Sequence, residues 1–258
     1  CDRCHSKRGD RGSYNRSGSV YALPIGWARV ALSSDSMRAE VMKVYESWHN
    51  LYHGTTVNAV ENILQTGSLA KAGDTTVGGN EVGVRGGHIK KPFDRTNAHT
   101  GQKESFDPNQ IFMSPSIKYA GNPDVYAKQV RWQDPLTKAN YFAQVAFQVR
   151  VRPGAKGGCT CAPCVAKWSA AEWPAAGGAG CSIGPETLSD TIGPIDPLFD
   201  NSELEWYTKA EEKVTIILTG LLVRLVPTGA AGAGSKGCAH KGKGRGGGSG
   251  GGGRAKKR

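Results

Sequence analysis

Three short stretches of the sequence carry side chains that could bind a ligand and act on it. An imidazole and a hydroxyl flank a glycine in the first, two aromatic rings and a serine stand in the second, and two carboxylates two residues apart form the third. A histidine, aromatic rings and a carboxylate at such wide separations suit a nucleotide-derived ligand. The candidates are His53, Gly54, Thr55, Phe112, Ser116, Tyr119, Glu203 and Glu205.

The first stretch is expected where a strand ends and a helix begins. Thr56 is the predicted N-cap of a helix over residues 57–66, and Gly67 is its predicted stop. An amphipathic helix before the strand is predicted from apolar residues at helical spacing. Because a strand-to-helix junction presents backbone N–H groups and a positive dipole end, it could hold an anion or an amide. The face of the earlier helix consists of Met37, Val41, Val44, Tyr45 and Trp48.

The second stretch predicts a short strand followed by a short helix. Residues 110–113 form the strand, Ser114 is the predicted N-cap and Pro115 the first helical residue. Ser116 and Tyr119 are three residues apart and then share a helical face. A ligand stacked on Tyr119 could therefore also be hydrogen-bonded by Ser116.

Alternation of apolar and polar residues predicts the main strands. Residues 141–152 alternate strictly, which indicates a half-buried antiparallel strand. Residues 27–32 are predicted to form an edge strand, and residues 214–226 a strand that pairs with residues 203–206 as a hairpin. With helices early, strands late and no βαβ alternation, the sequence predicts an α+β fold with a largely antiparallel sheet.

The net charge of +11 comes from the two ends of the chain. Residues 1–30 carry six basic and two acidic side chains, and residues 236–258 carry eight basic and none acidic. Such ends attract any polyanion, nucleic acid included, without specific docking. No apolar run approaches the length of a membrane-spanning helix. The predicted regions are a basic Cys- and His-containing arm with an entry strand (1–32), a central domain (33–227) with an irregular insertion (154–200), and a disordered Gly-, Lys- and Arg-rich tail (228–258).

Seven cysteines occur, most of them in two tight clusters. Their odd number and spacing suit thiolates around a metal better than a secreted disulfide framework. Zinc is the metal such ligands would hold, and free or oxidised surface cysteines are the alternative. Thiolate clusters favour an intracellular compartment, cytoplasmic or nuclear. The candidate ligands are Cys1, Cys4 and His5 in one cluster and Cys159, Cys161, Cys164 and Cys181 in the other.

The order and spacing of the three stretches resemble the His-Tyr-Glu class of ADP-ribosyltransferases, which includes diphtheria toxin and the poly(ADP-ribose) polymerases. The resemblance covers residues 50–226 and is strongest at 52–55, 116–119 and 201–205. It implies a split antiparallel sheet core with flanking helices and long loops, and NAD as the substrate. To a smaller extent, the arm and residues 22–27 are similar to sequences beside the transferase-like region of some neuralized-like proteins.

The resemblance implies a role for each candidate that binds NAD. In the class, the histidine of the first motif hydrogen-bonds the adenosine ribose and the glycine holds the nicotinamide amide, which are roles for His53 and Gly54. Thr55 completes that motif. Ser116 would also hold the amide and Tyr119 would stack on the nicotinamide ring.

The chain departs from the class at its first aromatic position. Phe112 stands where the class has its tyrosine, and in an alternative alignment Tyr119 itself is that tyrosine. By analogy with the Glu-x-Glu turn of other ADP-ribosyltransferases, Glu205 would be the catalytic carboxylate, which stabilises the oxocarbenium-like charge as the glycosidic bond breaks. Glu203 would orient the acceptor or the second glutamate.

The function implied is NAD-dependent transfer of ADP-ribose, as a single unit, to a protein or nucleic-acid acceptor with release of nicotinamide. The alternative is a catalytically weak or inactive module of the same fold. Such a module would act as a nucleic-acid-binding or assembly component through its basic ends.

Overall fold

The computed structural model describes residues 5, 7–34, 36–71, 73–75, 77–79, 81–82, 93–96, 103–106, 110–124, 126–153, 195–199, 204, 206–208 and 215–230. By its contacts the chain divides into two units, residues 1–228 and 229–258. Among the helices of the described residues, none has the length and apolar content to cross a bilayer. The named elements are β1 (Ser13–Arg16), β2 (Ser19–Ala22), β3 (Ala28–Ala31), α2 (Ser36–Val41), α3 (Val44–Ser47), β4 (His49–Thr55), η1 (Val57–Ala59), α4 (Val60–Thr66), β5 (Phe93–Thr96), β6 (Lys103–Phe106), β7 (Ile111–Met113), α5 (Ile117–Ala120), β8 (Val130–Gln133), β9 (Asn140–Val151), β10 (Trp206–Thr208), β11 (Ile216–Pro227) and η5 (Thr228–Ala230).

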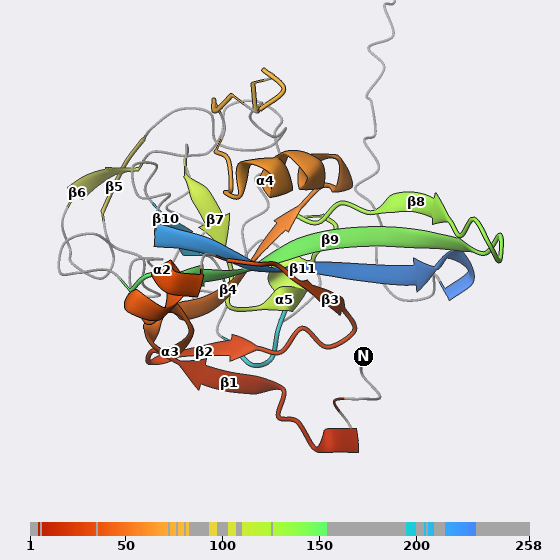
Figure 1. Cartoon of the computed structure of the whole chain (residues 1–258), viewed down its shortest axis with the longest axis horizontal. Helices are drawn as coiled ribbons and strands as arrows, with labels where there is room; N and C mark the ends of the chain where they lie inside the picture. The colour runs from red at the N-terminus through yellow and green to blue at the C-terminus, as the bar shows by residue number, and fades with distance from the viewer. Residues whose placement is uncertain are drawn as a thin grey trace, which may run out of the picture. The chain divides into compact units, whose positions relative to one another are not determined.

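A five-stranded antiparallel sheet forms the centre of the fold (Figure 1). Its order is β3-β11-β9-β4, and β8 pairs with the first residues of β9. The predicted edge strand is confirmed as β3. The strand predicted from alternation is confirmed as β9, and the strand predicted over 214–226 from its β-forming residues is confirmed as β11. Helices and antiparallel sheets together confirm the α+β class.

A second, two-stranded antiparallel sheet pairs β10 with β7. The predicted hairpin between residues 203–206 and the last strand is therefore wrong, because β11 is paired with β9 on one side and β3 on the other. The small sheet meets the large one at a single bridge, where the backbones of Tyr52 and Ser114 exchange hydrogen bonds of 2.8 and 2.9 Å. Beyond this bridge β4 and β7 do not continue as a ladder.

Both faces of the central sheet are covered, so the prediction of a half-buried β9 is wrong. Ile63 of α4 packs with Phe147 and Val149 on one face, and Ile117 of α5 packs with Tyr52 and Ala146 on the other. Of the polar residues of β9, Gln144 is enclosed with the second face, whereas Gln148 and Arg150 are partly exposed. Gln144 is fully buried, and its amide donates to the carbonyls of Gly121 and Ala127 at 2.8 and 2.9 Å. These two hydrogen bonds offset the cost of burying the amide.

The helix predicted before β4 is broken into two short helices. Lys43 separates α2 from α3 with φ 51°, a left-handed conformation that ends the first helix. Met37 and Val41 are 75% and 77% exposed, whereas Val44 and Trp48 are buried. The predicted apolar stripe is therefore wrong in its first half, because the break rotates α2 away from the core.

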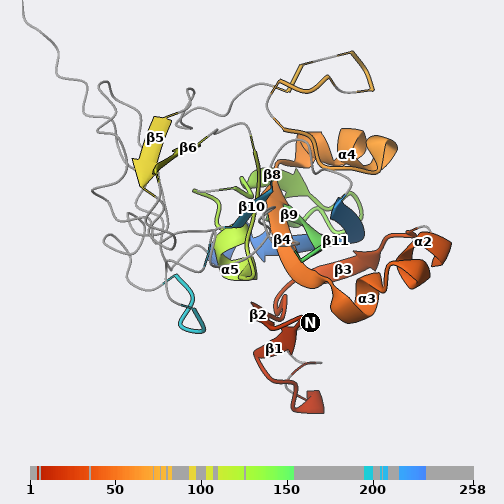
Figure 2. The ribbon, with the colours of Figure 1, turned by 90° about the vertical axis from the view of Figure 1, so that its left-hand side faces the viewer.

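Residues expected as part of an extended arm form a hairpin. Strands β1 and β2 pair around a tight turn at Ser17 and Gly18, both with positive φ. The end of the hairpin is attached to the core, because Ala22 N–H donates to the Pro115 carbonyl at 2.9 Å and the Tyr52 hydroxyl donates to the Ala22 carbonyl at 2.6 Å. Figure 2 shows the hairpin and α3 beside each other below β4.

Residues 71–108, which are rich in glycine, charged and turn residues, are described only in part, and so is the predicted insertion over residues 154–200. Within the first, β5 and β6 pair as an antiparallel hairpin, and Thr75 bridges Glu81. Residues 154–194 lie outside the described residues, as does the basic tail from 231 onward.

Candidate functional site

The first two candidate stretches contact each other where β4 and β7 diverge. His53 follows the Tyr52–Ser114 bridge, and its ring nitrogen Nδ1 lies 2.8 Å from the carbonyl oxygen of Phe112. In a continued antiparallel ladder the next hydrogen-bonded pair after Tyr52 and Ser114 would be Gly54 and Phe112. The imidazole takes the Phe112 carbonyl instead, at the point where the two strands part.

The hydrogen bond to Phe112 defines the state of His53. Because a carbonyl only accepts, Nδ1 must carry the proton, and the neutral ring then presents Nε2 as an acceptor. Burial lowers the pKa of His53, and the bond to the Phe112 carbonyl raises it by a smaller amount. His53 is therefore neutral at pH 7 and offers a fixed acceptor, which suits a ribose hydroxyl.

Gly54 is held where no other residue fits. A Cβ added to it would lie 1.8 Å from the carbonyl oxygen of Ala120 and 2.7 Å from the Cβ of Tyr126. The contact with Ala120 places the end of α5 directly against β4.

The backbone of Gly54 points away from the central sheet. Backbone groups alternate in direction along an antiparallel strand, and those of Tyr52 point toward Ser114. Those of Gly54, two residues later, therefore point to the same side, away from β9. An amide could pair with this edge of β4 as a further strand would.

Helix α5 begins two residues later than predicted. Ser116, not Ser114, is its N-cap, and the Ser116 hydroxyl accepts a hydrogen bond of 3.2 Å from Tyr119 N–H. Ser114 cannot have that role because its backbone bridges Tyr52, and Pro115 precedes the helix. The Ser114 hydroxyl instead accepts a hydrogen bond of 3.0 Å from Ser116 N–H.

Asp196 fixes the Ser116 hydroxyl. The hydroxyl donates to Asp196 Oδ2 at 2.6 Å, and both side chains are fully buried. Lys118 Nζ lies 3.7 Å from the other carboxylate oxygen, which also accepts from Leu198 N–H at 3.2 Å. Since the Ser116 proton is committed to Asp196, Ser116 could only accept a hydrogen bond from a ligand. Sequence reasoning missed Asp196, which is 80 residues away from Ser116.

Tyr119 is fully buried and packs in an aromatic cluster with Tyr126, Ile195, Phe199 and Leu204. The rings of Tyr119 and Tyr126 meet edge to face, with centroids 5.6 Å apart. Its position beside the end of β4 agrees with a role near Gly54. Its complete burial means that a ligand could reach the ring only if neighbouring side chains moved.

The two candidate glutamates, Glu203 and Glu205, lie outside the described residues, but their neighbours are described. Leu204 is buried in the Tyr119 cluster, and Trp206 begins β10 opposite Met113 of β7. Leu204 therefore lies against the α5 residue Tyr119, and Trp206 lies against β7.

The candidates are arranged around the edge of β4 rather than on one face of it. His53 and Phe112 lie on the side of the core that contains Leu51, while Gly54, Ser116 and Tyr119 lie on the side that contains Tyr52. Thr55 ends β4 opposite Val145, half-buried. Any ligand that used all of them would have to cross this edge at the split between the two sheets.

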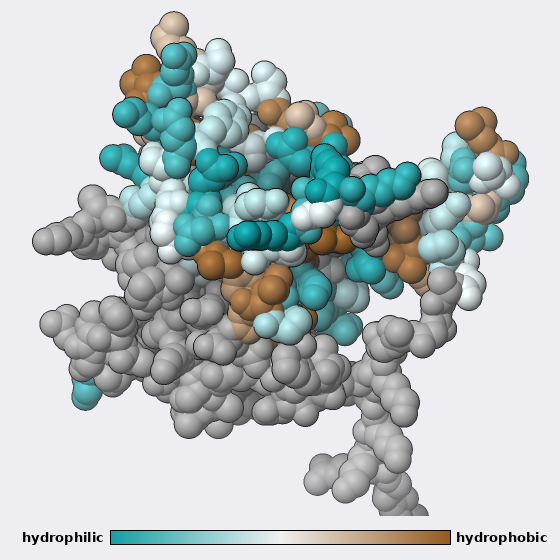
Figure 3. All heavy atoms as spheres, turned by 90° about the horizontal axis from the view of Figure 1, so that it is seen from below, coloured by the Kyte–Doolittle hydropathy of each residue, from teal (hydrophilic) through white to brown (hydrophobic). Residues whose placement is uncertain are grey.

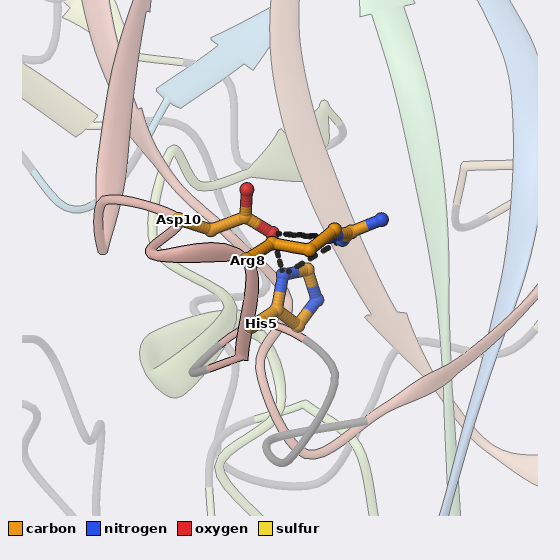
Figure 4. A network of polar contacts seen from close by, with 3 residues as sticks. All are labelled: His5, Arg8 and Asp10. Carbon is orange, nitrogen blue, oxygen red and sulfur yellow. Dashed lines mark hydrogen bonds and ion pairs between the residues drawn. The ribbon is translucent and has the colours of Figure 1, made fainter.

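No group of three or more candidate metal ligands is present among the described residues. The seven cysteines lie outside these residues, so only His5 of the predicted zinc ligands is described. Its Nδ1 lies 2.7 Å from Asp10 Oδ2, which Arg8 also approaches at 2.7 Å (Figure 4). The bond to His5, and to a lesser degree Arg8, holds the pKa of Asp10 below its usual value. This pairing leaves Nε2 of His5 as the nitrogen that could bind a metal.

No protein-family model matches this chain, and no solved structure matches it at a significant level.

Proposed function

We propose that this chain is an ADP-ribosyltransferase that cleaves NAD, releases nicotinamide and transfers a single ADP-ribose unit to a macromolecular acceptor. The observation that carries the proposal is the split between β4 and β7. There, His53 in a defined neutral state stands beside the outward backbone edge of Gly54. A nicotinamide carboxamide has one N–H donor group and one carbonyl acceptor, which complement the two backbone groups of Gly54.

The other candidate residues belong to elements that contact Gly54 or β7, so they lie near the split between β4 and β7. Ser116 and Tyr119 belong to α5, whose end contacts Gly54, and the segment around Leu204 and Trp206 contacts both α5 and β7. In this proposal His53 accepts from the adenosine ribose through Nε2, and Glu205 stabilises the positive charge that develops on the nicotinamide ribose. The chemistry requires no metal, since nicotinamide leaves as a neutral molecule.

The purified full chain is expected to release nicotinamide from NAD and to incorporate label from NAD that carries the label in its ADP-ribose part. Nicotinamide is measured by chromatography, and label on the chain or on added protein and RNA is followed separately. NAD turnover without incorporation would mean that water is the acceptor. If neither NAD binding nor nicotinamide release is detected, the proposed enzyme activity is wrong.

A second candidate, an inactive module of the same fold, is favoured by a different observation. Ser116 and Tyr119 are both fully buried, the Ser116 hydroxyl is already used by Asp196, and Phe112 lacks the hydroxyl of the tyrosine expected there. In that case the basic ends would carry the function through nucleic-acid binding.

Deletion of residues 228–258, with their excess of basic residues, tests the second candidate. If the tail binds nucleic acid, its removal weakens binding of single-stranded RNA and lowers the slope of log K against log salt by about 0.7 for each phosphate that the tail would have neutralised. Fluorescence anisotropy at several salt concentrations measures both quantities. Unchanged affinity and slope would exclude the tail as the binding element.

A further inference from the structure

Two arginines come together on the side of the sheet that carries the β1–β2 hairpin. Arg16 of β1 donates to the carbonyl of Tyr45 at 2.6 Å, and Arg150 of β9 donates to the carbonyl of Trp48 at 3.4 Å. The guanidinium of Arg150 lies 5.8 Å from the centre of the Tyr45 ring. Both arginines are thus held against α3 and the residue that follows it.

The charge of this pair is not balanced within the described part of the chain. Neither guanidinium forms an ion pair there. Burial lowers the pKa of Arg150, and the charge of Arg16 lowers it further, which shows that the two guanidinium groups are close. Two like charges that are partly buried without a carboxylate repel each other unless an anion joins them.

A buried amide lies beside Arg150. Asn50 of β4 is directly opposite Arg150 in the β4–β9 register, so the two side chains are neighbours on one face of the sheet. Asn50 is 2% exposed, and among the described residues neither its side-chain nitrogen nor its oxygen forms a hydrogen bond of good geometry. The Tyr52 hydroxyl lies close enough to Asn50 for a weak hydrogen bond that lowers the pKa of Tyr52, but burial outweighs it and raises that pKa. The Nε groups of Arg16 and Arg150 are likewise buried without a partner there. Buried polar groups are rarely left in this state unless water or an ion completes them.

We infer that Arg16, Asn50 and Arg150 form a binding site for a phosphate group. Three different side chains supply N–H donors from two strands of the sheet and from the hairpin, an arrangement that suits a tetrahedral oxyanion with several acceptor oxygens. The phosphate can be free or carried as an ester on a small molecule or side chain. In the view from below, the coloured residues are mostly hydrophilic or neutral, with separate hydrophobic groups among them (Figure 3).

Tyr45 and Tyr21 define the surroundings of this site. Tyr45 is 45% exposed, its ring lies under Arg150, and its hydroxyl shares a hydrogen bond of 2.9 Å with Ser34. Tyr21 lies near enough to Arg150 to influence its pKa. The ring of Tyr45 holds the guanidinium of Arg150 by its flat face, which leaves the N–H edge for an anion.

The site is separate from the proposed NAD site. Asn50 pairs with Arg150 in the β4–β9 register, whereas Gly54 pairs with Ala146, four residues farther along each strand. The chain could therefore bind phosphate at this site even if it does not cleave NAD.

The test titrates the full chain with inorganic phosphate and, separately, with O-phospho-L-serine, against chloride at the same ionic strength. Thermal unfolding and calorimetry report binding, and NMR follows the Nε–H signals of the arginines and the side-chain amide of Asn50. We expect saturable binding and shifts of these signals in at least one of the two titrations. A stronger response to the ester identifies a phosphorylated group as the ligand, and a stronger response to inorganic phosphate identifies the free ion.

Three variants separate a site from a structural clamp. Arg16→Gln should weaken phosphate binding by about tenfold or more, because a charge-assisted hydrogen bond is removed. Asn50→Asp keeps the shape of the side chain but places a carboxylate beside Arg150, so it should abolish binding in a folded protein. Arg29→Gln is the matched control, because Arg29 lies on the same face but donates to Gln148 and Thr219, and it should bind normally.

Absence of saturable binding in wild type would overturn the inference. So would unchanged binding in Asn50→Asp.

Discussion

Gly54→Ala is expected to lower the free energy of unfolding by about 3 kcal/mol or more, which is at the upper end of the usual cost of overpacking. The added methyl group would lie 1.8 Å from the carbonyl oxygen of Ala120, and neither atom belongs to a flexible side chain. Relief requires α5 to move away from β4, which would disturb the packing of Tyr119 and the Ser116–Asp196 hydrogen bond. Urea unfolding followed by fluorescence measures the change.

Gly67→Ala is the matched control for this substitution. Gly67 ends α4 with φ 65°, and a methyl group there meets no atom within 4 Å. The cost should therefore be only the conformational one, about 1 kcal/mol. Equal destabilisation of the two variants would contradict a close approach of Gly54 to α5.

The elements that sequence reasoning predicted correctly are those whose residues decide their own structure. Strands β9 and β11 are rich in β-branched, aromatic and leucine residues, and Gly67 ends α4 as expected. The passage from β4 into a helix after Thr56 is also present. In these places local propensity and tertiary packing favour the same structure.

The errors arose where a distant contact overrides a local preference. Ser114 followed by Pro115 is a good helix start by itself, but the backbone of Ser114 bridges Tyr52, so Ser116 is the N-cap and the helix begins at Ile117. Similarly, residues 204 and 206 have the alternation of a strand, but the strand begins only at Trp206, and its partner is β7 and not β11. Spacing along the chain does not reveal which of two strands is already paired on both edges.

The site shows the same limit. The motif around His53 and Gly54 is visible in the sequence, whereas Asp196 is not, because its only link to Ser116 is spatial. The pairing of Asn50 with Arg150 depends on the β4–β9 register, which a single sequence does not contain. Polar residues buried by tertiary packing are therefore the part of the site that only the structure reveals.

Glu205→Gln is expected to lower the rate of nicotinamide release by about 100- to 1,000-fold, the effect that follows when one preorganised electrostatic contact to a transition state is removed. Glutamine keeps the size of the side chain but not its charge, so it cannot stabilise an oxocarbenium-like ribose. NAD affinity should change much less, because the charge develops only as the bond breaks. Single-turnover measurement of nicotinamide release and calorimetry with NAD separate the two quantities.

Two further glutamates serve as controls for this variant. Glu203→Gln, on the same segment, should leave NAD cleavage largely intact and reduce transfer to the acceptor, since its proposed role is to orient that group. Glu40→Gln, on the exposed surface of α2, should change neither. Because Leu204 and Trp206 on either side of Glu205 are buried against α5 and β7, the unfolding curve of each variant must match wild type before rates are compared. If Glu205→Gln turns over NAD as fast as wild type while Glu203→Gln does not, the two glutamates exchange roles. If both variants remain as active as wild type, the carboxylate that stabilises the transition state lies elsewhere in the chain.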